Sequence, residues 1–155
     1  ADWRLLCVGK DSGILSDLKA QAKDRKLGRR VLWLGQRTDI PNVLAAADIG
    51  VLASREEGLP TVVMEGMAAG LPMVVTNVGG NSELVIDNKT GIVVPPRNPK
   101  KMASALLSLA NDAVLREKMG LRGRTQITEN FSLERCVAEY RSLYDSLLNQ
   151  LVAKI

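Results

Sequence analysis

The segment 54–61 has the residues of an anion-binding corner, because it follows an apolar run and opens a predicted helix. Gly58 allows a ligand to approach the backbone closely, and Pro60 suits a helix entry, where no N–H partner is needed. A helix N-terminus presents unpaired N–H groups and a partial positive charge, which together stabilise an anion. We therefore predict that a phosphate is held by backbone groups at Gly58, Leu59 and Thr61.

Two carboxylates, Glu57 and Glu65, flank this corner. Carboxylates accept hydrogen bonds from vicinal hydroxyls, so the pair could hold a sugar on one side and a ribose on the other. The alternative is that Glu57 faces solvent in the first turn, where it favours the helix dipole, and that Glu65 is a surface residue. Glu65 has apolar neighbours, namely Val62, Val63, Met64, Met67 and Ala68. A charge in so apolar a helix predicts a partner or a ligand, because burying it unpaired is expensive.

The composition excludes several kinds of chemistry. The chain has 155 residues and no histidine, so it contains no imidazole base, no histidine charge relay and no imidazole metal ligand. Its two cysteines, Cys7 and Cys136, lack the spacing of a zinc or redox motif, and we expect both to be reduced. We predict no metal site. Only 3% of the residues are aromatic, which disfavours stacking on single-stranded nucleic acid, and we expect no nucleic-acid partner.

Charge and hydropathy are those of an ordinary globular protein, with 46% hydrophobic and 25% charged residues. The net charge of +4 is dispersed, which usually means a solvated face but also suits an anionic small molecule or a membrane surface. No apolar run reaches spanning length and no signal peptide precedes the first strand. We expect a cytoplasmic protein, with peripheral membrane association of the whole protein as an option. The sequence predicts no oligomeric state.

Short apolar runs alternate with longer amphipathic stretches along the chain. The runs predict five strands, at 3–8, 31–34, 49–53, 73–76 and 92–94. Helical spacing and stop signals predict helices at 14–27, 41–47, 61–69, 82–86, 100–110, 113–119 and 133 to about 152. Strands so short and continuously apolar are typical of a parallel sheet buried on both faces. The fold class is therefore α/β, a Rossmann-like parallel sheet flanked by helices with a helical C-terminal tail. Ligands of such sheets bind outside the carboxyl ends of the strands.

The segment from Glu57 to Val75 resembles the glutamate–seven–glutamate motif of the retaining GT-B glycosyltransferases of family 4. Further segments match this family in order and spacing, namely 31–35, 47–54, 78–83 and 90–96. Each piece alone is weak, but together they cover the chain from about Leu5 to Leu147. The resemblance implies that residues 1–155 are the donor-binding domain, the domain that takes a nucleotide-diphosphate sugar.

The resemblance also implies a role for each motif residue. Glu57, the catalytic residue, would contact hydroxyls of the donor sugar, and Glu65 would hold the ribose hydroxyls. Backbone amides of the linking turn, at Gly58, Leu59 and Thr61, would lie against the sugar and diphosphate, and Pro60 belongs to the same donor-binding turn. The loop with Gln36 and Arg37 would border the base, although Arg37 could equally be plain surface charge. Gly79 and Gly80 are better explained by a tight turn and helix packing. No cofactor is implied beyond the donor substrate itself.

Two parts of the family pattern have no counterpart in the sequence. One is the N-terminal domain that binds the acceptor. The other is the first strand–helix unit of the donor domain, which carries the arginine and lysine that neutralise the diphosphate. Lys10 lies on an adjacent loop but is a poor substitute. We therefore expect a fragment that binds donor weakly and transfers no sugar alone.

Two other functions stay open at this point. The chain could be a non-catalytic nucleotide-binding module, which its helical tail slightly favours. It could also be a nucleotide-sugar epimerase domain, a class that shares the GT-B layout but not the Glu57–Glu65 motif. An oxidoreductase is disfavoured, because no Gly-x-Gly-x-x-Gly follows the first strand.

Overall fold

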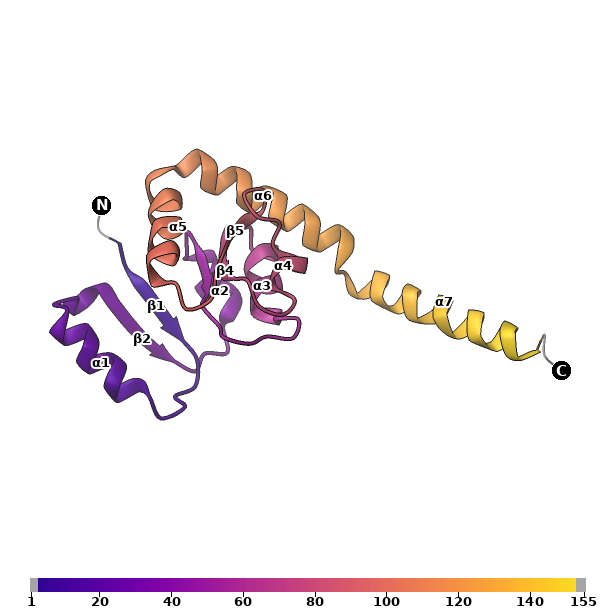
Figure 1. Ribbon diagram of the computed structural model, residues 1–155, viewed down its shortest axis with the longest axis horizontal. Coiled ribbons are helices and arrows are strands. Elements are labelled where there is room, and N and C mark those ends of the chain that lie inside the picture. Colours follow the sequence, from indigo (N-terminus) through magenta and orange to yellow (C-terminus); the bar gives the residue numbers. More distant parts are fainter. Residues whose placement is uncertain (1–2, 153–155) are drawn as a thin grey trace. The chain divides into compact units, whose positions relative to one another are not determined.

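The computed structural model describes residues 3–152 and divides into two compact units between Ile40 and Pro41 (Figure 1). Parallel strands flanked by helices occur in both units, which confirms the predicted fold class.

The first unit is a β–α–β crossover. It consists of β1 (Leu5–Val8), α1 (Leu15–Asp24), the 3₁₀ turn Gly28–Arg30 and β2 (Val31–Gly35). Strands β1 and β2 pair in parallel, with Leu5 opposite Val31. The prediction of a helix as far as Leu27 was too long, because Lys26 takes a left-handed conformation with φ 55° and breaks the helical path.

The second unit carries a three-stranded parallel sheet in the order β3-β4-β5. Its elements are α2 (Ile40–Ala45), β3 (Gly50–Leu52), α3 (Thr61–Ala68), β4 (Met73–Thr76), α4 (Asn81–Leu84), β5 (Gly91–Val94), α5 (Pro99–Asn111), α6 (Ala113–Asn130) and α7 (Leu133–Val152). Strand β4, which lies between β3 and β5, is buried at every position. The prediction that all strands are buried on both faces was therefore wrong for β1 and β3, and Val51 in β3 is 40% exposed.

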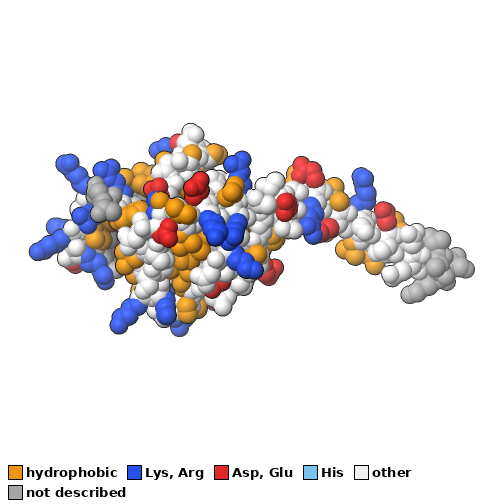
Figure 2. Space-filling view, turned by 90° about the horizontal axis from the view of Figure 1, so that it is seen from above, with side chains coloured by type: hydrophobic (Ala, Val, Ile, Leu, Met, Phe, Trp, Pro, Cys, Tyr) orange, Lys and Arg blue, Asp and Glu red, His pale blue; other side chains and the backbone are white. Residues whose placement is uncertain are grey.

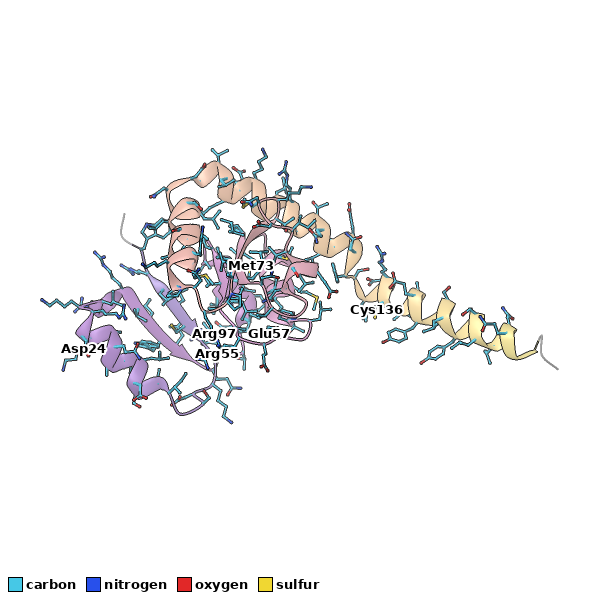
Figure 3. All side chains as sticks on the ribbon, viewed as in Figure 1. Asp24, Arg55, Glu57, Met73, Arg97 and Cys136 are labelled. Atoms are coloured by element: carbon cyan, nitrogen blue, oxygen red, sulfur yellow. The ribbon has the colours of Figure 1, made fainter. Side chains whose placement is uncertain are left out.

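The side chain of Met73 packs between helix α3 and this sheet. Its side chain fills the space left by two glycines, Gly50 in β3 and Gly66 in α3 (Figure 3). A Cβ added at Gly66 would lie 2.6 Å from the Met73 sulfur, and one at Gly50 would overlap the same atom. A larger residue at either position would therefore require the end of the Met73 side chain to shift.

Helix α6 packs equally closely on the end of α3. A Cβ at Gly120 would overlap the carbonyl oxygen of Gly70, and Gly123 faces the side chain of Met67. The predicted end of this helix at Met119 was wrong, because α6 continues to Asn130 through both glycines. The core between these elements contains Val63, Met67, Leu71, Met73, Val75, Leu84, Val85 and Ile127.

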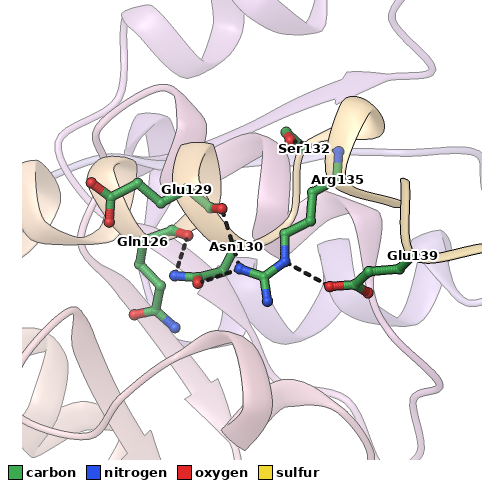
Figure 4. Close-up of polar contacts among 6 residues, drawn as sticks. All are labelled: Gln126, Glu129, Asn130, Ser132, Arg135 and Glu139. Atoms are coloured by element: carbon green, nitrogen blue, oxygen red, sulfur yellow. Dashed lines mark hydrogen bonds and ion pairs between the residues drawn. The ribbon is translucent and has the colours of Figure 1, made fainter. Parts of the chain in front are cut away.

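Helix α7 begins at a corner held by Arg135 (Figure 4). Its guanidinium donates to the Asn130 side-chain oxygen at 3.0 Å and to Glu139 at 2.7 Å, so it links the end of α6 to the second turn of α7. Ser132 caps α7, since its hydroxyl accepts from the Arg135 backbone N–H.

From residue 133 to 150 every side chain of α7 is exposed. The exposed residues include an apolar stripe of Val137, Tyr140, Leu143, Tyr144 and Leu147. The rings of Tyr140 and Tyr144, the two tyrosines of the chain, lie 6.4 Å apart on it. The two tryptophans, Trp3 and Trp33, belong to the first unit.

Candidate functional site

The loop between β3 and α3 carries Glu57 and is braced by the turn that follows β4 (Figure 3). Gly80 donates from its backbone N–H to the Gly58 carbonyl oxygen at 2.7 Å. Gly79, with φ 49°, lies so close that a Cβ there would overlap the Glu57 carbonyl oxygen. Two glycines of one turn thus fix the backbone of the other, in line with the packing role predicted for them.

The N-terminus of α3 is open. Pro60 is the residue before the helix, in an extended conformation, and no side chain caps the first turn. Within residues 3–152, the backbone N–H groups of Gly58, Leu59 and Thr61 donate to no acceptor. Leu59 and Thr61 are exposed and Pro60 is buried. The corner therefore offers unpaired donors and the positive end of a helix dipole to an anion.

Glu57 is half-buried beside this corner. One of its carboxylate oxygens, Oε1, accepts a hydrogen bond from the Ser54 hydroxyl at 2.5 Å. The other, Oε2, has no partner among the described residues and can accept from a ligand hydroxyl.

Glu65 lies on the same exposed face of α3 as Thr61, one helical turn further along. The opposite face buries Val63, Gly66 and Met67. In the part of the chain that the structure describes, no group forms a hydrogen bond or ion pair with the Glu65 carboxylate. The partner predicted for this charge is therefore not found among these residues. In the structure without a ligand, Glu65 is a surface residue, as in the alternative interpretation. Its carboxylate is accessible to a ligand.

Gln36 and Arg37 belong to the first unit and are exposed directly after β2. Arg37 donates to both carboxylate oxygens of Asp39, at 2.8 and 2.6 Å. This hydrogen-bonded pair lowers the pKa of Asp39 and raises that of Arg37. The Arg37 side chain is thus engaged within its own loop.

Two shallow pockets of the second unit, of about 340 and 300 Å³, are not lined by the predicted residues of 57–65. Within residues 3–152, no group of three or more histidine, cysteine or acidic side chains could hold a metal ion. No helix there is long and apolar enough to cross a bilayer.

Sequence reasoning missed Ser54, Thr76 and Asn81, which connect Glu57 to the core by hydrogen bonds. Thr76 donates to the Ser54 carbonyl oxygen at 2.8 Å, and Asn81 donates to the Thr76 carbonyl oxygen at 2.9 Å. For Thr76 a sequence signal existed, because it is a polar residue directly after the apolar run 73–75, where burial demands a hydrogen bond. Asn81 follows two glycines and carries no such signal.

Residues 1–112 match the family described as glycosyl transferases group 1. An Escherichia coli UDP-Gal:α-D-GlcNAc-diphosphoundecaprenol α-1,3-galactosyltransferase is 34% identical over 142 residues, which are 90% of this chain and 36% of that protein. A Bacillus anthracis N-acetyl-α-D-glucosaminyl L-malate synthase is 31% identical over 147 residues, which are 95% of this chain and 38% of that protein.

Solved structures share the fold over nearly the whole chain. Sucrose-phosphate synthase from Thermosynechococcus elongatus superposes with a TM-score of 0.86 at 28% identity, over 95% of this chain and 39% of that one. TarM from S. aureus, in a complex that contains UDP, superposes with a TM-score of 0.83 at 26% identity, over 91% of this chain and 29% of that one. The chain spans well under half the length of these relatives.

Proposed function

The chain belongs to the group 1 glycosyl transferases, and we propose that it is the donor-binding half of a retaining enzyme of this family. The whole enzyme would transfer a sugar from a nucleotide-diphosphate sugar to an acceptor. The complex of TarM that contains UDP supports a nucleotide donor.

One observation carries the proposal, namely the unpaired amides of Gly58, Leu59 and Thr61 between two accessible carboxylates. The amides and the α3 dipole suit a diphosphate. Oε2 of Glu57 suits a hydroxyl of the donor sugar, and Glu65, further along the same helix, suits the ribose.

In the proposed reaction the bond between the sugar's anomeric carbon and the diphosphate oxygen breaks, and a bond to the acceptor oxygen forms on the same face. The acceptor proton passes to the leaving diphosphate, so no protein base is required. Glu57 positions the sugar, and the start of α3 at Thr61 stabilises the charge that develops on the diphosphate. We propose that no metal ion takes part, because the helix end and protein cations would supply this charge stabilisation.

We propose that acceptor binding and part of the charge stabilisation are functions of other segments of the whole enzyme. We propose that an N-terminal domain binds the acceptor and that a further strand–helix unit supplies cations to the diphosphate. The relatives are more than twice as long as the segment they share with this chain, which supports this arrangement. We expect the chain alone to bind donor weakly and to transfer no sugar.

We also propose a cytoplasmic location with peripheral attachment to an anionic membrane surface. Exposed cations gather over the first unit, from α1 to the start of β2 (Figure 2). They are Lys19, Lys23, Arg25, Lys26, Arg29 and Arg30. Flotation with anionic and neutral vesicles tests this, and equal recovery with both would contradict it.

Calorimetry against a panel of nucleoside diphosphates and their sugars tests the donor site. We expect one nucleotide sugar to bind more tightly than its nucleoside diphosphate, and Glu57→Gln to remove that increment, about tenfold in Kd. Glu134→Gln, an exposed glutamate of α7, is the matched control. Failure of every member of the panel to bind would contradict the proposal.

A non-catalytic nucleotide-binding module is the second candidate, which the exposed helical tail α7 slightly favours. A single-turnover assay on the full-length protein separates the two, since a module would form no glycoside.

A further inference from the structure

The side chain that orients Glu57 is Ser54. Its hydroxyl donates to Glu57 Oε1 at 2.5 Å, and both residues are half-buried. A serine hydroxyl has a single proton to donate, so in this arrangement Glu57 takes all of it. The bond occupies Oε1 and leaves Oε2 to accept from a ligand.

Ser54 is itself fixed by the core of the second unit. Thr76, at the end of the fully buried strand β4, donates from Oγ1 to the Ser54 carbonyl oxygen at 2.8 Å. Asn81, with no exposed surface, donates from Nδ2 to the Thr76 carbonyl oxygen at 2.9 Å. Three successive hydrogen bonds thus run from a buried amide at the start of α4 to a carboxylate at the surface.

This arrangement removes freedom that Glu57 would otherwise have. A free glutamate side chain samples several rotamers, and fixing one of them on ligand binding costs conformational entropy, which weakens the affinity. A short hydrogen bond to an ionised oxygen is among the stronger ones, and a buried anchor keeps its donor in place. Glu57 is therefore set in one orientation before any ligand arrives.

We propose that Ser54 is a positioning residue, which holds Glu57 so that Oε2 faces the donor sugar. This inference rests on the proposed function, because it takes the sugar as the ligand of Glu57. It predicts that loss of the hydroxyl weakens recognition of the sugar and leaves recognition of the nucleotide unchanged, since the amides of Gly58, Leu59 and Thr61 do not depend on it.

The experiment compares Ser54→Ala, Ser54→Thr and the unaltered chain. Ser104→Ala, which removes an exposed hydroxyl bonded only to a backbone carbonyl of α5, is the matched control. Calorimetry gives the Kd for a nucleoside diphosphate and for its sugar conjugate, and in the full-length enzyme kcat and KM are measured separately. NMR relaxation of the Glu57 methylene groups gives the mobility of that side chain without any ligand.

We expect Ser54→Ala to weaken binding of the nucleotide sugar about tenfold, with an unchanged Kd for the nucleoside diphosphate. Glu57 should become more mobile, and Ser54→Thr should restore both properties. Equal losses for the two ligands, or an unchanged mobility of Glu57, would overturn the inference. If the unaltered chain binds neither ligand but Glu57 gains mobility in Ser54→Ala alone, Ser54 keeps its positioning role and the donor assignment fails instead.

Discussion

The backbone N–H of Gly80 donates to the carbonyl oxygen of Gly58 at 2.7 Å, which joins the turn after β4 to the loop that opens α3. The bond satisfies the Gly58 carbonyl and leaves the N–H of the same residue unpaired. The geometry of the anion-binding corner is therefore set by a turn that contributes no side chain to the predicted site.

Replacement of Gly79 by alanine should destabilise the second unit by about 3 kcal/mol, because the added Cβ meets the Glu57 carbonyl oxygen in a left-handed backbone. Gly70→Ala is the matched control, since Gly70 has φ 82° but no atom within 4 Å of the position that a Cβ would take. It should cost about 1 kcal/mol. Urea denaturation measures both, and equal losses would show that contact with Glu57 is unimportant.

Glu65→Ala should abolish the part of the affinity that depends on the ribose hydroxyls, about 2 kcal/mol for a charged hydrogen-bond acceptor. Calorimetry with a nucleoside diphosphate and its 2′,3′-dideoxy analogue measures that part as a difference. Because Glu65 is exposed, the substitution should leave the melting temperature unchanged. A persistent preference of Glu65→Ala for the ribose form would place the ribose elsewhere.

Leu109→Ala should cost about 2–5 kcal/mol, because Leu109 is fully buried between α5 and the sheet. Leu143→Ala, on the apolar stripe of α7, should cost less than about 0.5 kcal/mol, because its side chain is 52% exposed. Thermal denaturation of the two variants checks the contrast. A large loss for Leu143→Ala would show that the stripe is covered in solution.

Arg37→Ala should raise the pKa of Asp39, because the guanidinium that favours the carboxylate form is removed. A lowered folded pKa stabilises the first unit above the usual pKa of an aspartate, and this contribution is lost as the pH falls through the folded value. NMR titration of the Asp39 carboxyl carbon measures the shift. An unchanged titration would mean that the pair does not form in solution.

Element types were predictable where the local pattern agreed with the packing. The apolar run 73–76 forms the central strand, and the spacing of apolar residues in 61–69 forms α3 within one residue. The pattern failed at α6, where Gly120 and Gly123 look like a helix end. The helix continues through both glycines, where α6 lies against Gly70 and Met67. This is a tertiary contact, which the local spacing of residues does not predict.

The unpaired backbone amides of the candidate site could be predicted from the sequence, but the hydrogen bonds that hold its side chains could not. The open amides at Gly58, Leu59 and Thr61 follow from a glycine, a proline and a helix start in sequence. The role of Ser54 follows only when Thr76, 22 positions away, closes on its carbonyl oxygen. The burial of strand β3 was overestimated because an apolar run does not reveal which of its side chains other elements cover, and Val51 is exposed.

The placement of the aromatic residues limits what optical methods can report. Tryptophan emission would follow the first unit alone, since Trp3 and Trp33 both lie there, and tyrosine emission would follow only the exposed helix α7. The core around Met73 contains no chromophore of either kind, so intrinsic fluorescence would not report local unfolding around the start of α3.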